Sequence, residues 1–362
     1  MSGDEEYLHR HAMADRSLAE GRSAGIAAYS LPCVNLNRNE NPFPMPDVVM
    51  RAAFAAIGTH NRYPEEDSGG LRSAAARAYG VSVEQVIAGN GSSEILALIY
   101  RGFLAAGDTV GMLSPGFSFN HKLAAVNGAR LLEVDWADHN ALPASQSVRQ
   151  AAGDAKFIVL ANPNNPTGTF VQIAEIERLV AETDQLIVLD EAYVDFAPDN
   201  ALGLIDRYQN LLLLRTFSKS YAAAGLRIGF GLGNPRVIAR LRSIQNPFNM
   251  SVISQSVGVS ILEHRNAYDQ CIECIVQERE RTMVALSALG FYVLPSHANF
   301  VLARVPLGYD GRWWQQALER KNVNVAVFPE GDLGGFIRIS IGAAEQMDTC
   351  LSVVSGIAGG LI

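Results

Sequence analysis

The sequence predicts an α/β protein whose large domain holds a mostly parallel seven-stranded sheet and whose second, smaller domain is α+β. Three observations lead to this prediction. The chain has 362 residues, which is too long for one ordinary core. Short apolar runs alternate with helical patterns from about residue 70 to 265. Several of these runs are almost entirely Val, Ile and Leu, as in strands buried on both faces of a parallel sheet.

Seven apolar runs are the expected strands of the large domain. They are Val86–Ala88, Thr109–Leu113, Arg130–Val134, Phe157–Ala161, Leu186–Asp190, Leu211–Arg215 and Arg227–Leu232. Helices are expected between them. Ile173–Val180 has apolar residues at i, i+3 and i+4 spacing, and Pro235–Ile244 begins with Pro at a helix-start position.

A second pattern begins after residue 265. Residues 266–289 predict a long helix that ends at Gly290. Short strands are expected around Phe291–Val293, Phe300–Ala303 and Phe336–Ile341, with a helix over Arg312–Lys321. We therefore expect an irregular N-terminal segment over residues 1–35 on or near the small domain, a large domain over 36–265 and a small domain over 266–362.

Composition narrows the classes of partner. Hydrophobic residues make up 48% of the chain, charged residues 18%, and the formal net charge is −8. This is a globular composition, and its negative charge disfavours nucleic acid and anionic membranes as partners. The sequence contains no run of 18 apolar residues and no apolar signal-peptide core. Cys271 and Cys274 have C-x-x-C spacing but no second ligand pair, so we expect packing residues, no metal and a cytoplasmic location.

Polar strings follow four of the expected strands. Gly89–Glu94 leads into a helix, whose start offers free N–H groups to an anion. Asn162–Gly168 forms a rigid turn, and Asp190 follows four apolar residues, where a carboxylate needs a donor or cation. Lys219 ends another strand and is followed by Arg227. Each string alone also fits a helix cap, a turn or a solvated charge, but ligands bind beyond such strand ends, and together the strings predict a site.

These strings resemble those of the fold-type I enzymes that depend on pyridoxal 5′-phosphate (PLP). The segments Asn162–Gly168, Asp190–Tyr193 and Ser218–Arg227 are similar to those of class I/II aminotransferases, most closely the histidinol-phosphate aminotransferase branch. Further similarity lies in Leu36–Pro42, Arg62–Pro64, Ala298–Phe300 and Ile337–Ser340. The resemblance covers nearly all of residues 35–345. It implies PLP as cofactor, a small-molecule amino donor and a 2-oxo acid acceptor such as 2-oxoglutarate.

The resemblance also implies a role for individual residues. Lys219 would form the Schiff base and shuttle the proton, and Asp190 would pair with the pyridine nitrogen. The remaining roles are Asn165 and Tyr193 on the O3′ oxygen, Gly91, Ser92, Ser93, Ser218 and Arg227 around the phosphate, Phe117 stacked on the ring, and Arg338 on the substrate carboxylate or another anion. Tyr63 would reach the cofactor phosphate and substrate of the partner subunit, which implies a homodimer.

The sequence departs from that branch at one position. Many of its members carry an arginine just after the strand equivalent to Val323–Val327, where it helps to bind the substrate phosphate. Here Ala326 aligns with it, and no Arg or Lys lies between Lys321 and Arg338. An aromatic or other amino acid therefore stays open as the donor beside histidinol phosphate.

Other functions stay open from the residues alone. A PLP-dependent decarboxylase needs the same lysine, aspartate and phosphate site, although Arg338 favours transamination. A Rossmann dehydrogenase is suggested by the glycines of Gly229–Asn234, but their spacing does not match G-x-G-x-x-G. A regulatory binding module of this fold would need an attached DNA-binding segment, and the chain shows none.

Overall fold

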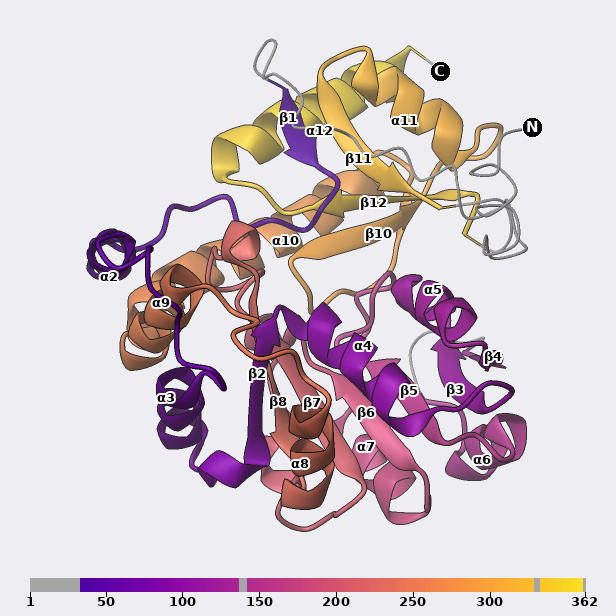
Figure 1. Cartoon of the computed structure of the whole chain (residues 1–362). Coiled ribbons are helices and arrows are strands. Elements are labelled where there is room, and N and C mark those ends of the chain that lie inside the picture. The colour runs from indigo at the N-terminus through magenta and orange to yellow at the C-terminus, as the bar shows by residue number, and fades with distance from the viewer. Residues whose placement is uncertain (1–32, 137–141, 329–332, 361–362) are drawn as a thin grey trace, which may run out of the picture. The chain divides into compact units, whose positions relative to one another are not determined.

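The computed structural model describes residues 33–136, 142–328 and 333–360, which form two sheets with their helices (Figure 1). The larger sheet has the strand order β2-β8-β7-β6-β5-β3-β4. Its strands are β2 (Val86–Asn90), β3 (Thr109–Ser114), β4 (Arg130–Asp135), β5 (Phe157–Ala161), β6 (Leu186–Asp190), β7 (Leu211–Thr216) and β8 (Ile228–Gly233). Only β8 is antiparallel to its neighbours in this sheet. The predicted mostly parallel seven-stranded sheet is confirmed.

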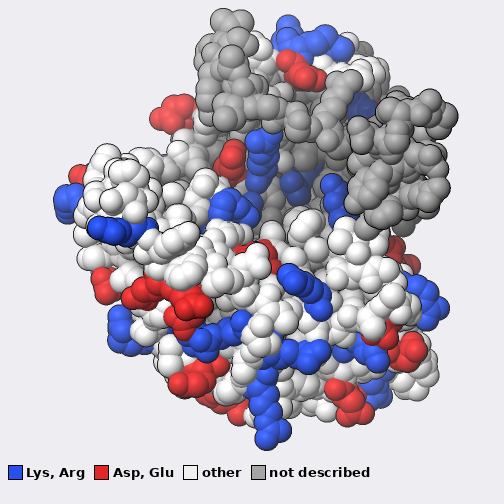
Figure 2. Space-filling view, in the orientation of Figure 1, with Lys and Arg blue, Asp and Glu red and all other residues white. Residues whose placement is uncertain are grey.

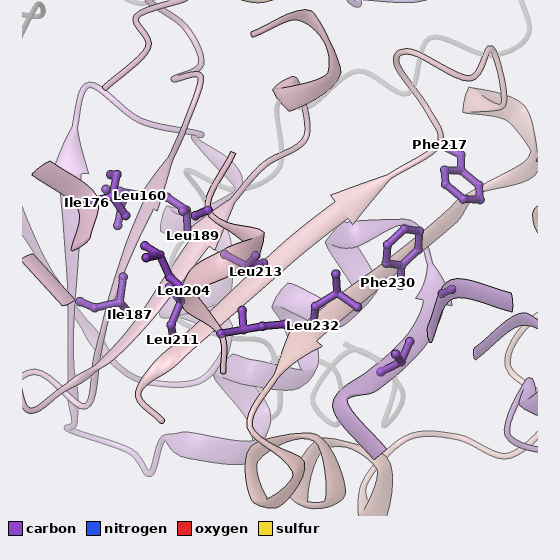
Figure 3. Close-up of a cluster of buried hydrophobic side chains, with 14 of the residues drawn as sticks. Leu160, Ile176, Ile187, Leu189, Leu204, Leu211, Leu213, Phe217, Phe230 and Leu232 are labelled. Carbon is purple, nitrogen blue, oxygen red and sulfur yellow. The ribbon is translucent and has the colours of Figure 1, made fainter. Parts of the chain in front are cut away.

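Helices cover both faces of this sheet, as the run of apolar residues in β7 requires. Leu212 and Leu214 pack into one apolar cluster with α4 (Ser92–Phe103) and α8 (Pro235–Ser243). Leu211 and Leu213 pack into another with α3 (Gly69–Tyr79), α6 (Ser145–Ala152), α7 (Ile173–Ala181) and α9 (Val252–Glu263). Figure 3 shows Leu211 and Leu213 within the second cluster. The four leucines have no exposed surface, and burial of each side chain contributes about 2 kcal/mol.

The helices of this part follow the predicted pattern and add several that were not predicted. They are α2 (Asp47–Ile57), α3 (Gly69–Tyr79), α4 (Ser92–Phe103), α5 (Phe119–Val126), α6 (Ser145–Ala152), α7 (Ile173–Ala181), α8 (Pro235–Ser243) and α9 (Val252–Glu263). Short 3-10 turns occur at η2 (Val83–Gln85), η3 (Val194–Phe196), η4 (Leu202–Leu204), η5 (Ala224–Leu226) and η6 (Arg265–Tyr268). No helix in the described ranges is long and apolar enough to cross a membrane.

The smaller sheet has the strand order β1-β11-β12-β10-β9. Its elements are β1 (Val34–Leu36), β9 (Tyr292–Val293), β10 (Phe300–Arg304), β11 (Val323–Val327), β12 (Phe336–Ser340), α10 (Asp269–Ala288), α11 (Gly311–Glu319) and α12 (Ala344–Gly359). The expectation of irregular structure through residue 35 is wrong for Val34 and Asn35, because β1 pairs in parallel with β11. Residues 1–32 lie outside the described residues, and the predicted domain boundaries stay predictions.

Candidate active site

A cavity of about 750 Å³ lies between the two sheets, a volume that suits a cofactor together with a small substrate. It begins at the carboxyl ends of β5, β6 and β7 and reaches β11 and β12 of the smaller sheet. Figure 2 shows basic side chains around this hollow. The sequence-predicted residues that line it are Ser92, Ser93, Phe117, Asn165, Asp190, Tyr193, Ser218, Lys219, Arg227 and Arg338.

One end of the cavity forms a cup of hydrogen-bond donors. Helix α4 starts there at Ser92, and Arg227 lies so close that a side-chain carbon on Gly91 would be 2.6 Å from its Nη2 atom. Gly91 also has a φ of 75°, in the left-handed region that favours glycine. Arg227 Nη1 donates to Ser218 Oγ at 3.1 Å. A helix start, a guanidinium and a hydroxyl are the groups that bind a phosphate.

Close packing of β8 against the start of α4 keeps this cup narrow. A side-chain carbon on Gly229 would lie 2.3 Å from the backbone nitrogen of Ser92. Thr216 Oγ1 accepts a hydrogen bond from the backbone N–H of Ser218 at 3.1 Å, which fixes the Ser218 backbone. Glycine at 229 is therefore required by this close approach, and its role is structural rather than that of a dinucleotide loop.

Lys219 enters the cavity from the loop after β7. Its Nζ donates to the carbonyl oxygen of Arg38 at 3.1 Å and lies 5.7 Å from the centre of the Tyr193 ring. Asn41 Nδ2 donates to the carbonyl oxygens of Lys219 and Ser220, at 3.1 and 3.0 Å. The hydrogen bonds from Asn41 hold the backbone of Lys219, while its amino group donates to the Arg38 carbonyl oxygen. The amino group is therefore available to react.

Two carboxylates follow one another at the end of β6, and only Asp190 lines the cavity. It accepts a hydrogen bond from Ala192 N at 3.0 Å, and burial raises its pKa to about 6. Glu191 is buried and paired, since its Oε2 accepts from Arg215 Nη2 at 2.6 Å. Asp190 is thus the carboxylate that gains most from a bound cation, such as a protonated pyridine nitrogen.

Tyr193 reaches the cavity from the turn after β6 and is held by Asn39. Asn39 Nδ2 donates to the tyrosine oxygen at 3.0 Å, so the hydroxyl hydrogen of Tyr193 is left for another acceptor. Asn39 also donates through its backbone N–H to Ser340 Oγ at 2.8 Å and accepts from Asn299 Nδ2 at 3.0 Å. It therefore links the tyrosine to the strands of the smaller sheet.

Arg338 in β12 forms the opposite wall. Its Nη1 donates to Asn165 Oδ1 at 2.6 Å and its Nη2 to the carbonyl oxygen of Asn37 at 3.2 Å, while its Nε is buried without a partner. Burial lowers the pKa of this guanidinium. Ala326 pairs with Arg338 in the antiparallel register of β11 and β12 and lines the same cavity, so no cation comes from that position.

Phe117 and Tyr63 differ in their position relative to the cavity. Phe117 lines the cavity, and its ring centre lies 5.9 Å from that of Phe119. Tyr63 is 83% exposed, contacts the ring of Phe248 at 4.9 Å and does not line the cavity of its own chain. Phe117 is thus placed to stack on a ring within the cavity, whereas Tyr63 lies on the surface outside it.

Sequence reasoning missed some residues of the site. Asn39 and Arg38 belong to the Leu36–Pro42 string, to which no individual role was assigned. Asn39 is buried at a φ of 54°, a conformation that asparagine tolerates, but neither its burial nor its φ can be read from the sequence. His121 lines the cavity mouth, where its Nε2 lies 2.5 Å from Glu133 Oε1, and nothing in the sequence indicated it.

The residues present fit PLP. The cup at α4 matches its phosphate, Asp190 matches its pyridine nitrogen, Lys219 matches its aldehyde, and Phe117 offers a ring to stack on. Within the described residues, there is no group of three His, Cys, Asp or Glu side chains that would hold a metal.

Comparison with known proteins agrees with this chemistry. The sequence profile of the family described as "Aminotransferase class I and II" matches residues 32–357. The chain is 61% identical over 325 residues to histidinol-phosphate aminotransferase 3 of Mesorhizobium japonicum, across 90% of this chain and 88% of that protein. It is also 61% identical over 326 residues to histidinol-phosphate aminotransferase of Sinorhizobium fredii, across 90% of this chain and 89% of that protein. The crystal structure of histidinol-phosphate aminotransferase from Sinorhizobium meliloti in complex with pyridoxal-5'-phosphate has a TM-score of 0.84 at 27% identity, across 100% of this chain and 96% of that chain.

Proposed function

This chain belongs to the aminotransferase class I and II family, and from that membership we propose that it transfers the amino group of histidinol phosphate to 2-oxoglutarate. It is a PLP-dependent transaminase of the histidinol-phosphate aminotransferase type. The observation that carries the choice of donor is the 61% identity to two proteins of that name. The proposal also assigns a role to each residue of the site.

Bound PLP supplies an electron sink for the electron pair that remains when the Cα–H bond of the substrate breaks. Lys219 holds the cofactor and, once released from it, moves the proton at Cα. Asp190 holds a proton on the pyridine nitrogen, and Tyr193 donates its hydroxyl hydrogen to the neighbouring O3′ oxygen together with Asn165. Support for these roles comes from the shared cavity and from the raised pKa of Asp190.

The remaining site residues bind and orient. The start of α4, with Gly91, Ser92 and Ser93, forms the phosphate cup together with Ser218 and Arg227. Phe117 packs on the cofactor ring. Arg338 binds the anionic group of the substrate with its two terminal nitrogens, after its bond to the Asn37 carbonyl is exchanged. The substrate then lies beside Arg338, which keeps its hydrogen bond to Asn165.

We also propose a homodimer in which Tyr63 reaches the partner's site. Tyr63 contacts the exposed ring of Phe248, and Met50, Phe54 and Ile57 are further exposed large apolar side chains. These three lie on α2, where Figure 2 shows mostly uncharged residues. A second copy of the chain that covers them would bury this surface. A cytoplasmic location is part of the proposal and is supported by the unpaired thiols of Cys271, Cys274 and Cys350.

An apolar wall favours a second class of donor. Ala326, Val327, Phe328 and Leu333 line the cavity beside Arg338. Such a wall also fits the side chain of an aromatic amino acid. Phenylalanine and tyrosine are therefore the donors to compare with histidinol phosphate.

The decisive experiment has two parts. Borohydride reduction followed by peptide mass mapping is expected to place the cofactor on Lys219, and an adduct elsewhere contradicts the assigned chemistry. A panel of donors with 2-oxoglutarate is expected to give the highest kcat/KM with histidinol phosphate. A higher value with phenylalanine or tyrosine would assign the donor to the aromatic class, and release of carbon dioxide without glutamate formation would make the enzyme a decarboxylase.

A further inference from the structure

We infer that Arg38 determines specificity by binding the phosphate group of the phosphorylated amino donor. The inference rests on the proposed function and extends it, because it names the residue that separates a phosphorylated donor from an unphosphorylated one. Three observations lead to it. They are the strand register around Ala326, the partners of the other cations in the cavity, and the charge of a phosphate monoester.

The strand register brings the segment that leads into Arg38 beside the position where β11 lacks a cation. Leu36 in β1 pairs in parallel with Val325, and the next residue of β11, Ala326, pairs with Arg338. The segment after Leu36 stays close to this pair of strands, since Arg338 Nη2 donates to the carbonyl oxygen of Asn37. Arg38 follows directly, and it lines the cavity with Ala326 and Arg338.

The other basic side chains of the cavity already have partners or tasks. Among the described lining residues, these are His121, Lys219, Arg227 and Arg338. His121 contacts Glu133, Lys219 is the cofactor lysine, and Arg227 belongs to the phosphate cup with Ser218. Arg338 donates to Asn165 and faces the substrate.

Arg38 is the exception in this set. Its side chain is exposed, and in the described part of the chain no carboxylate pairs with it. Its own carbonyl oxygen accepts from Lys219 Nζ at 3.1 Å, which puts its backbone next to the reacting amine. A long guanidinium side chain that starts at this point, with no carboxylate partner among the described residues, can reach a group bound beside Arg338.

A phosphate group requires more positive charge and more hydrogen-bond donors than Arg338 alone supplies. A phosphate monoester carries a charge of about −1.5 to −2 at pH 7 and three strong acceptor oxygens, whereas a carboxylate carries one charge and two oxygens. One guanidinium with two terminal nitrogens matches the carboxylate. Arg38 supplies the second guanidinium, so the segment after β1 contributes the cation that β11 lacks.

The test compares donors that differ only in the phosphate. Single-turnover kcat/KM is measured with histidinol phosphate and with histidinol for the wild type, Arg38→Gln and Arg38→Lys. Loss of a charge-assisted hydrogen-bond pair is expected to lower the ratio of the two values by about 10- to 100-fold in Arg38→Gln. Arg38→Lys is expected to keep part of the ratio, because a lysine supplies charge without the planar fork. Rates with histidinol and glutamate are expected to change by less than about threefold.

A binding measurement separates recognition from chemistry. The pyridoxamine form of the enzyme cannot accept another amino group, so calorimetry on it gives the dissociation constant of histidinol phosphate, which is expected to rise in Arg38→Gln by a similar factor. Arg320→Gln is the matched control, since Arg320 is exposed and lies outside the cavity. A wild type that does not react with histidinol phosphate overturns the proposed function and this inference together. A reactive wild type with an unchanged ratio in Arg38→Gln overturns the inference alone.

Discussion

Strand β6 ends at Asp190 and is followed directly by Glu191, and these two adjacent carboxylates have opposite properties. Glu191 points into the interior, where its side chain has no exposed surface and accepts from Arg215 Nη2 and Nε at 2.6 and 2.9 Å and from Ala201 N at 2.7 Å. Asp190 lines the cavity and accepts from one backbone N–H, and burial raises its pKa to about 6. The interior carboxylate is satisfied by the fold, whereas the cavity carboxylate is left short of partners.

The number of partners of each carboxylate distinguishes a structural charge from a functional one. Removal of one partner from a buried ion pair destabilises the fold, because the other charge is left uncompensated in the interior. A carboxylate that the fold desolvates without a cation costs stability and gains it back when a cationic ligand binds. Burial of the residue alone does not distinguish the two cases, but the count of its partners does.

The largest effect is expected from Asp190→Asn. Asparagine keeps the shape but cannot hold a proton on the pyridine nitrogen, so turnover is expected to fall by about 10³- to 10⁴-fold. Thermal unfolding of the cofactor-free variant is expected to match the wild type or exceed it. The measurement is single-turnover kinetics with the amino donor beside a thermal melt. A near-normal rate would show that the pyridine nitrogen has another partner.

Glu191→Gln is expected to lower stability and to leave the rate nearly unchanged, the reverse of Asp190→Asn. It leaves Arg215 buried without its counter-charge, so the free energy of unfolding is expected to fall by about 3 kcal/mol. The rate per folded, cofactor-loaded enzyme is expected to stay within about threefold of the wild type. Urea unfolding of the holoenzyme measures the first quantity and single-turnover kinetics the second. A stable variant with a large rate loss would assign Glu191 to the chemistry and break the contrast.

A smaller effect is expected from pH on the cofactor-free protein. The pKa of Asp190 is about 6 in the folded chain and about 3.9 in the unfolded chain, so between these values the folded state binds more protons. Stability therefore falls as pH rises from about 4 to 6 and carries a constant penalty above that range. The penalty is on the order of 2 to 3 kcal/mol, because one pKa unit corresponds to about 1.4 kcal/mol.

The matched measurement is the unfolding free energy of the wild type minus that of Asp190→Asn, both without cofactor. Other titrating groups cancel in this difference, and the asparagine has no charge to titrate. The difference is expected to decrease between pH 4 and 6 and to stay level above pH 6. An increase over the same interval would mean that the carboxylate is stabilised in the folded chain.

The cofactor side of the cavity was predictable because it obeys a local rule. The apolar runs that form β5, β6 and β7 are buried parallel strands, and the polar residues that follow them lie at one edge of the sheet. Asp190, Lys219 and Asn165 therefore come together from sequence order alone. The pairing of Glu191 with Arg215 was not predicted, because two adjacent acidic residues look alike until their partners are known.

The substrate side follows no such rule. Strand β1 has three residues, Val34–Leu36, and is too short for periodicity to show. Asn39 depends on Ser340, which lies 301 positions away in the chain, and Arg38 lines the cavity only because β1 pairs with β11. These contacts arise from tertiary structure, so the sequence could identify the motif but not its role.

The smallest effect on turnover is expected from loss of the hydrogen bond between Asn39 and Tyr193. This bond connects the cofactor side of the cavity with the substrate side. Asn39 Nδ2 orients the tyrosine hydroxyl, so Asn39→Gly, which tolerates the φ of 54°, is expected to lower turnover by about 5- to 10-fold. Tyr193→Phe is expected to have a similar effect, and the double variant little more than either, which gives a coupling of about 1 kcal/mol. The pH titration of the visible absorption of the bound cofactor is expected to shift equally in all three variants. Additive losses, or a titration unchanged in Asn39→Gly, would mean that Asn39 only supports the fold, and the cofactor side would then be independent of the smaller sheet.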